Sequence, residues 1–297
     1  MNSLKLVHFV TAICSTEREI LRGLIKMFKW NSEFNLVVDS ELFESYICGI
    51  EKGMNVDDLH FTVLAMIGAL AIHNPYAPCI YTTLDNILIT MAQDVEFKAT
   101  AKIRNGIMNG FNTLNKYGAI VMSEPFTGDK KQIICITVSN VAHVQEDCYF
   151  QIGRKELSTI MKESSTPHHL ITILCNYASR FNVIAYTSFQ KGEWHKEYYD
   201  SGASTFKKLS CWASQDTITS SWINVCGEEC LRKDKWEVRQ PQYSRYCSQL
   251  VELKILDRIV IAHDNGRTSY YFRPTHRDCV LWSLDLLSRQ QDWHKEK

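Results

Sequence analysis

Residues 250–272 read LVELKILDRIVIAHDNGRTSYYF and join the end of a helix to two strands. Ile255 to Ala262 and Arg267 to Phe272 are both typical of strands, being rich in β-branched, aromatic and other apolar residues. Between them stands His263-Asp264-Asn265-Gly266, and the Asn-Gly pair favours a tight turn because both residues tolerate positive φ. The stretch therefore predicts a helix followed directly by a β-hairpin.

The helix that leads into this hairpin has two distinct faces, with Pro241 expected in its first turn. Its inward positions are apolar or aromatic: Tyr243, Tyr246, Cys247, Leu250 and Leu253. The opposite face carries Gln242, Arg245 and Gln249, and Arg245 is the best single candidate for a contact to a DNA base. Arg267 at the tip of the hairpin and Arg273 at its exit are placed to touch a DNA backbone or minor groove.

A similar order of elements is predicted between residues 57 and 138. Apolar spacing, caps and turn residues indicate a buried helix over 57–73, a short helix capped near Thr82 or Thr83, a longer helix over 96–117, and strands over 119–122 and 132–138. A turn at 125–130 joins the strands. Three helices followed by a strand, a basic turn and a strand form the order of a winged helix-turn-helix.

The third helix of this unit has a polar face opposite its buried one. Lys98, Lys102, Asn105 and Asn109 share that face if the helix spans 96–117. Lys neutralises phosphate and Asn can bond adenine edges, so the face suits DNA, although any solvated helix also shows a polar stripe. Arg104 in the same helix and Lys130 and Lys131 at the turn complete the basic set.

Charge is unevenly distributed along a chain whose 33 basic residues balance 33 acidic ones. Residues 98–131 hold six basic and two acidic residues, and residues 231–277 hold ten basic and five acidic ones. These two basic segments carry net charges of +4 and +5, and they coincide with the two predicted helix-and-hairpin units. This distribution fits two interpretations: two cationic surfaces that bind phosphate, or an ordinary surface of mixed charge.

The rest of the chain predicts an N-terminal helical arm over residues 1–54 and two domains, over 55–145 and 146–297. In the second domain we expect helices over 154–162, 166–181 and 217–230, and an insertion of strands and exposed loop over about 182–210. A last amphipathic helix over 277–290 either closes the core or joins two subunits of a homodimer. The predicted fold class is α+β, mainly α with small β wings.

The segments 59–138 and about 217–273 resemble tandem winged-helix DNA-binding proteins, in particular replication initiators of plasmids and phages. The resemblance covers somewhat under half of the chain. It implies that Lys98, Lys102, Asn105, Arg245 and Gln249 read bases while Lys130, Lys131 and Arg267 contact phosphates. The neutral net charge and the insertion at 182–210 depart from that pattern.

Motifs for other chemistry are missing or weak. The sequence has no Gly-rich phosphate loop, no His-Glu-x-x-His pair and no Gly-x-Ser-x-Gly elbow. Proteins that nick DNA in rolling-circle replication have two His flanking one apolar residue for a metal, whereas His168 and His169 are adjacent here. Cys211, Cys226, Cys230 and Cys247 lack a Cys-x-x-Cys spacing, so reduced structural thiols are favoured over a zinc site. We expect four tryptophans to lie in the core or an interface, although they could stack on single-stranded bases: Trp194, Trp212, Trp222 and Trp236. We expect no enzymatic activity, no cofactor and no metal.

The longest apolar run, Phe61 to Ile72, is too short to cross a bilayer, and residues 1–16 lack a secretory pattern. We therefore expect a cytoplasmic protein that does not enter membranes. The function expected is sequence-specific binding of double-stranded DNA in plasmid or phage replication initiation. The alternatives are a transcriptional regulator of a mobile element and a winged-helix scaffold for protein partners, the latter favoured by the neutral charge. Partners beyond DNA would be replication or transcription proteins.

Overall fold

A computed structural model describes residues 36–39, 43, 56–74, 77, 79–138, 149–190, 213–214, 233–262, 265–266 and 268–274. Helices pack with small antiparallel sheets in this part of the chain, which confirms the α+β class. Among the described residues, no helix combines the length and hydrophobicity that a membrane span requires.

The first group of elements lies between residues 56 and 137. Its members are α4 (Val56–Ile72), β2 (Ile80–Thr82), α5 (Leu84–Ala92), α6 (Ala101–Lys116), β3 (Val121–Met122) and β4 (Ile134–Thr137). The strands form an antiparallel sheet in the order β2-β4-β3, with Tyr81 opposite Cys135 and Val121 opposite Thr137. The sequence predicted this order of helices and both hairpin strands but not β2, whose three residues are too few to show a period.

Capping residues set the bounds of α5 and α6. The hydroxyl of Thr83 accepts a hydrogen bond from the backbone nitrogen of Asn86 at 3.2 Å, and that of Thr100 accepts one from Ile103 at 3.4 Å. Gly118, at φ +74°, follows the end of α6. Because Thr100 is the cap, α6 begins five residues later than predicted and Lys98 precedes the helix, so the expected helical spacing between Lys98 and Lys102 is wrong.

Close packing of α4 against α6 builds the centre of this group. From Leu59 to Ala71 every residue of α4 is buried or glycine, as a core helix requires. A Cβ atom at Gly110 would lie 2.5 Å from the backbone oxygen of Phe61, and one at Gly106 would lie 2.4 Å from the Phe61 ring. Since no side chain fits there, the two glycines allow the helix backbones to approach.

The second group lies between residues 167 and 274. It comprises α9 (Pro167–Gln190), β6 (Ala213–Ser214), α13 (Lys233–Glu252), β7 (Leu256–Ala262) and β8 (Thr268–Pro274). Its sheet has the order β6-β8-β7, again with the middle position taken by the last strand of the group. The hairpin predicted around Asn265-Gly266 is confirmed, with Ala262 paired to Thr268.

Two predictions about these helices are wrong. The helix expected to end at residue 181 continues to Gln190, so the first part of the expected insertion is helical. No glycine or proline interrupts residues 168–190, so no helix-breaking residue ends the helix at 181. Pro241, expected in a first turn, lies inside α13, eight residues after its start at Lys233. The helix expected at 217–230 and that at 277–290 lie outside the described residues.

Residues 36–39 form a strand where a helical arm was predicted. This strand, β1 (Leu36–Asp39), pairs antiparallel with β5 (Tyr149–Ile152), and Leu36 lies opposite Ile152. Four residues are too short for a reliable helical period, and the pairing joins segments more than a hundred residues apart. Except for Phe43, the rest of the predicted arm lies outside the described residues.

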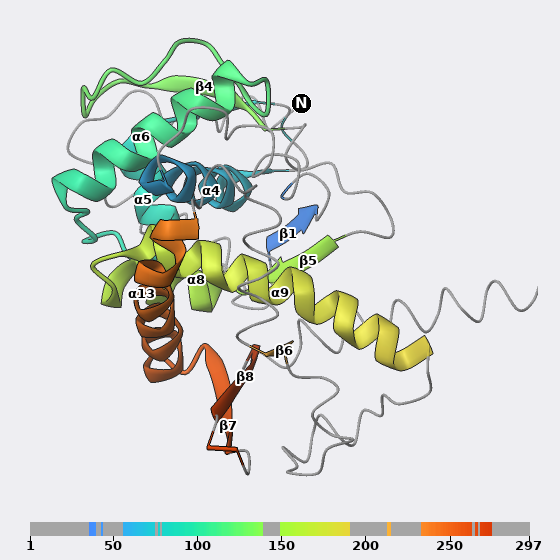
Figure 1. The fold of residues 1–297 in the computed structure, drawn as a ribbon. Coiled ribbons are helices and arrows are strands. Elements are labelled where there is room, and N and C mark those ends of the chain that lie inside the picture. The colour runs from blue at the N-terminus through green and yellow to red at the C-terminus, as the bar shows by residue number, and fades with distance from the viewer. Residues whose placement is uncertain are drawn as a thin grey trace, which may run out of the picture.

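Helix α8 (Arg154–Glu163) connects the two groups. Its Ser158 hydroxyl donates to the oxygen of Ala92 at 2.6 Å, and its Arg154 guanidinium donates to the oxygen of Ala71 at 3.1 Å, which ties α8 to the ends of α5 and α4. Helices α4 and α9 also pack together, so one continuous core runs through both groups. Figure 1 shows the two hairpins at opposite ends of the molecule with α4 and α9 between them.

Candidate nucleic-acid interface

The outer face of α6 is polar and exposed as the sequence predicted. Lys102, Asn105 and Asn109 are all exposed. On the inner face of the helix, Ile103 and Ile107 are almost fully and fully buried. The helix is therefore amphipathic, and its solvent side offers one ammonium group and two amides. These are groups that can donate to phosphate or to base edges.

Arg104 does not belong to that face. Its guanidinium forms an ion pair with Asp85 of α5, and its side chain is only 14% exposed. Burial lowers the pKa of Arg104 from its ordinary value without removing the charge at neutral pH. The residue therefore ties α6 to α5, a pairing that helical spacing cannot show because the partner lies on another element. Its predicted contact with DNA stays a prediction.

The loop between β3 and β4 is anchored on α6 by an amide that the sequence reading missed. The Asn112 Nδ2 donates to the oxygen of Phe126 at 3.0 Å, and its Oδ1 accepts from the nitrogen of Phe126 at 2.9 Å. Phe126 itself is buried and packs edge-on against Phe111. The N–H and the C=O of Phe126 are both bonded to the Asn112 side chain, so the loop is positioned relative to α6. In the sequence, the only sign of this anchor is an Asn directly after the buried Phe111.

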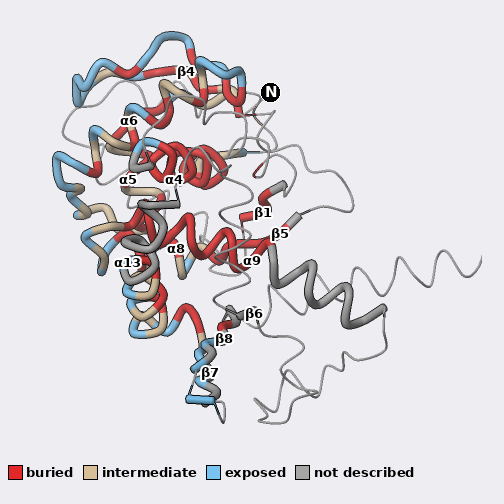
Figure 2. The backbone as a smooth tube through the Cα atoms, viewed as in Figure 1, coloured by how far each residue is buried: buried red, intermediate tan, exposed pale blue. Residues whose placement is uncertain are grey.

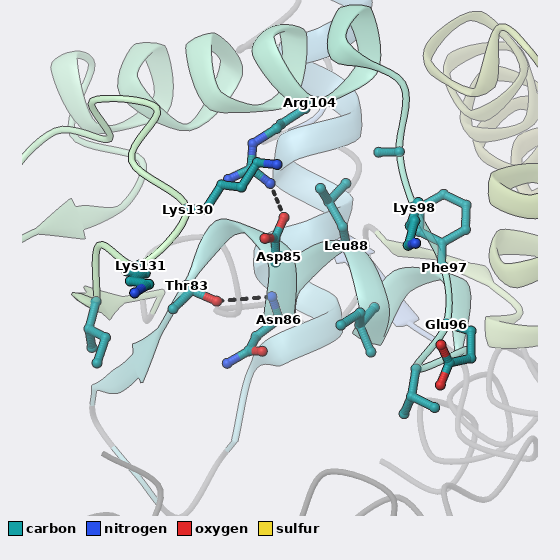
Figure 3. A pocket seen from close by; sticks show the side chains of 14 residues that line it. Thr83, Asp85, Asn86, Leu88, Glu96, Phe97, Lys98, Arg104, Lys130 and Lys131 are labelled. Atoms are coloured by element: carbon teal, nitrogen blue, oxygen red, sulfur yellow. Dashed lines mark hydrogen bonds and ion pairs between the residues drawn. The ribbon is translucent and has the colours of Figure 1, made fainter. Parts of the chain in front are cut away.

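Four of the predicted cations meet at a pocket of about 600 Å³ between α5, the start of α6 and this loop. Its lining includes Lys98, Arg104, Lys130 and Lys131 together with Asp85. Figure 3 shows these side chains entering from three separate segments of the chain. Lys98, Lys130 and Lys131 are exposed, whereas Arg104 is held by Asp85. Lys102 and Asn105 do not line the pocket and form a separate part of the surface.

The second predicted face lies on α13. Gln242, Arg245 and Gln249 are exposed, and Tyr243, Cys247 and Leu250 on the other side are buried. The Gln242 amide donates to the Tyr246 hydroxyl at 2.9 Å. Arg245 and Gln249 lie in the C-terminal half of α13, near the start of β7, whereas Lys102 and Asn105 lie in the N-terminal half of α6, far along the chain from β3.

The structure describes one of the two arginines predicted at the second hairpin. Arg273 belongs to β8 and lies opposite Asp257 in the register of the sheet. Arg267 lies outside the described residues. The expected contacts of these arginines with a backbone or minor groove stay predictions.

A stack of aromatic rings joins the two groups. The Phe61 ring of α4 stacks on His168 of α9 with centroids 4.0 Å apart, and His169 stacks on Tyr246 of α13 at 4.7 Å. Burial, aided by the neighbouring charges of His169 and Lys102, lowers the pKa of His168 to about 3. His168 is therefore a neutral packing residue at the junction, and His169 packs beside it.

The described residues contain no group of three or more His, Cys, Asp or Glu side chains that could hold a metal ion. Cys247 is fully buried 3.6 Å from the Tyr177 hydroxyl, and burial raises its pKa to about 12. The other three cysteines considered as zinc ligands lie outside the described residues: Cys211, Cys226 and Cys230. Of the four tryptophans considered for base stacking, only Trp236, in α13, is among the described residues.

Comparison of the chain with protein-family models, with curated proteins and with solved structures gave no match.

Proposed function

We propose that the protein binds double-stranded DNA through two winged-helix units. The first is formed by α4, β2, α5, α6, β3 and β4, and the second by α9, β6, α13, β7 and β8. The observation that carries the proposal is the shared architecture: each unit has an antiparallel sheet with its last strand in the middle and an amphipathic helix directly before its hairpin. In both units that helix exposes cationic and amide side chains.

In this proposal, α6 and α13 are the helices that enter major grooves. Lys102 and Arg245 would supply charge, and Arg245 has the forked guanidinium that suits guanine O6 and N7. Asn105 and Gln249 carry amides, which suit the N6 and N7 of adenine. Lys130 and Lys131 in the loop that Asn112 anchors would contact phosphates beside the first groove.

The biological role proposed is replication initiation of a plasmid or phage, with transcriptional control of a mobile element as the near alternative. Both roles need the same binding chemistry. Sequencing the genomic fragments that the protein retains separates them, because initiation predicts repeated sites at a replication origin and regulation predicts sites at promoters.

A protein-interaction scaffold is the second candidate function. It is favoured by a specific observation on the outer face of the first sheet, where the apolar side chains of Tyr81 and Val121 are 50% and 57% exposed. The zero net charge agrees with it. A scaffold of this kind would show no steep salt dependence towards DNA.

Gel-shift competition at several salt concentrations tests the main proposal. DNA affinity should fall steeply as salt rises, because each neutralised phosphate releases a counterion. The double variant Lys102→Ala with Arg245→Ala should lose preference for the selected site. Lys155→Ala with Lys162→Ala on the exposed side of α8 is the matched control, since it removes the same charge away from both units. Unchanged selectivity in the first double variant would contradict the proposal.

A further inference from the structure

The pocket between α5, the start of α6 and the β3–β4 loop has features that the proposed docking of α6 does not use. Its volume of about 600 Å³ exceeds what a single side chain or a few waters occupy. Its lining combines apolar side chains, among them Leu88, Phe97 and Ile133, with the cations. Figure 3 shows Phe97 and Lys98 on one side of the pocket and Arg104 and Lys130 extending toward the same region on another.

Arg104 presents an unsatisfied donor at this pocket. Its Nη1 is bonded to Asp85, but its Nη2 is buried and has no hydrogen-bond partner among the described residues. A buried donor without a partner costs free energy, and a guanidinium fork is matched by two oxygen atoms of one anion. An anionic ligand with several oxygens would satisfy the second nitrogen while Asp85 keeps the first.

Three lysines line the same pocket as this arginine. Lys98 comes from the segment before α6, and Lys130 and Lys131 come from the β3–β4 loop. The Asp129 carboxylate accepts from the nitrogen of Lys131 at 2.9 Å, which fixes the turn that carries both lysines. Only Asp85 and Glu96 oppose the four cations in the lining, and Asp85 already pairs with Arg104. The pocket therefore favours an anion of more than one charge.

We propose that this pocket binds a phosphate group carried by a nucleotide. The phosphate oxygens accept from Arg104 Nη2 and from the surrounding lysines, and the apolar part of the nucleotide lies against Phe97 and Ile133. Ile133 is 43% exposed, so it is available for such a contact. A free nucleoside triphosphate and a nucleotide within DNA present the same chemistry, and only the DNA source rests on the proposed function.

Calorimetric titration of the full chain with ATP and with pyrophosphate tests the free source. Binding of one ATP per chain is expected, and Lys130→Ala with Lys131→Ala should weaken it about tenfold or more, since charge-assisted hydrogen bonds are lost. Arg104→Lys keeps a cation beside Asp85 but removes the Nη2 donor, so it should weaken ATP binding while thermal melting shows a folded chain. Lys155→Ala with Lys162→Ala should leave binding unchanged.

A second titration uses duplex DNA in which single phosphates are replaced by methylphosphonate. If the pocket takes a DNA phosphate, one neutral position weakens wild-type binding and has no further effect on Arg104→Lys. ATP binding without DNA binding supports the pocket and contradicts the proposed function. DNA binding with neither ATP binding nor a position that depends on Arg104 overturns the inference and leaves the proposed function standing.

Discussion

The two hairpins of this protein place their loops in different ways. In the first unit the loop between β3 and β4 folds back onto α6, where Asn112 holds both polar groups of Phe126. In the second unit, β7 and β8 form a ladder of seven residue pairs that extends away from the core, with Val260 51% and Tyr270 39% exposed. Figure 2 shows the described residues of this hairpin as exposed toward its tip, with buried ones at its base.

The difference shows that two ways of positioning a loop differ in how sensitive they are to substitution. A loop anchored by side chains depends on a few specific atoms of the neighbouring helix, so it is sensitive to single substitutions. A ladder depends on backbone hydrogen bonds that most side chains leave intact. We therefore expect the first unit to be less tolerant of substitution than the second, and the following changes test that expectation.

The largest effect is expected at the contact of α4 with α6. Gly110→Val places its side chain against the Phe61 backbone oxygen, which cannot move without shifting α4. The overpacking should destabilise the chain by about 3 kcal/mol. Gly266→Ala in the second hairpin is the matched control, because no atom lies within 4 Å of its Cβ and only the positive φ of 75° opposes it. Urea denaturation followed by circular dichroism measures both, and equal losses would contradict the comparison.

The junction of the two units should make stability depend on pH. The folded pKa of His168, about 3, lies below its unfolded value, so its contribution is fully present above pH 6.5 and is lost as pH falls toward 3. One proton limits the loss between pH 7 and pH 5 to about 2 kcal/mol.

His168→Leu tests this assignment, since it removes the titrating group and should flatten the profile of unfolding free energy against pH. His73, whose pKa is also lowered by burial, would contribute in the same direction and leave a weaker slope. Because His168 stacks on Phe61 across the junction, both units should unfold in one transition. Two separate transitions with an unchanged pH profile in the variant would count against a shared core.

Asn112→Ala should destabilise the first unit by about 1.5 kcal/mol, because two hydrogen bonds to Phe126 are lost. It should also lower DNA affinity, since Lys130 and Lys131 lose their fixed position. Asn109→Ala is the control, because Asn109 stands three residues earlier in α6 and is exposed. It should change stability by no more than about 0.5 kcal/mol. Thermal melting compares the two variants directly; equal melting temperatures would show that the loop does not need its anchor.

The smallest effect is expected at the ion pair between α5 and α6. Asp85 is 43% exposed, so Asp85→Asn should cost no more than about 1 kcal/mol. High salt should reduce that difference further. Denaturation at low and high salt measures it, and a loss of several kcal/mol would mean that the pair, and not Asn112, organises this unit.

Local patterns predicted much of both units correctly. Apolar residues at helical spacing located α4, α5, α6, α8 and part of α13, and Asn265-Gly266 located the second turn. The exposure of Lys102, Asn105 and Arg245 followed from the same period. These features are decided by neighbours three or four positions away, which the sequence displays directly.

Only the tertiary structure decided the features that join distant segments. The sequence by itself determined the order of helices and the turns, because each depends on a few adjacent residues. It did not determine that β1 pairs with β5, that Arg104 is taken by Asp85, or that Asn112 holds Phe126. Each of these contacts forms between elements that become neighbours only after the core has brought them together, and no local period records the identity of such a partner.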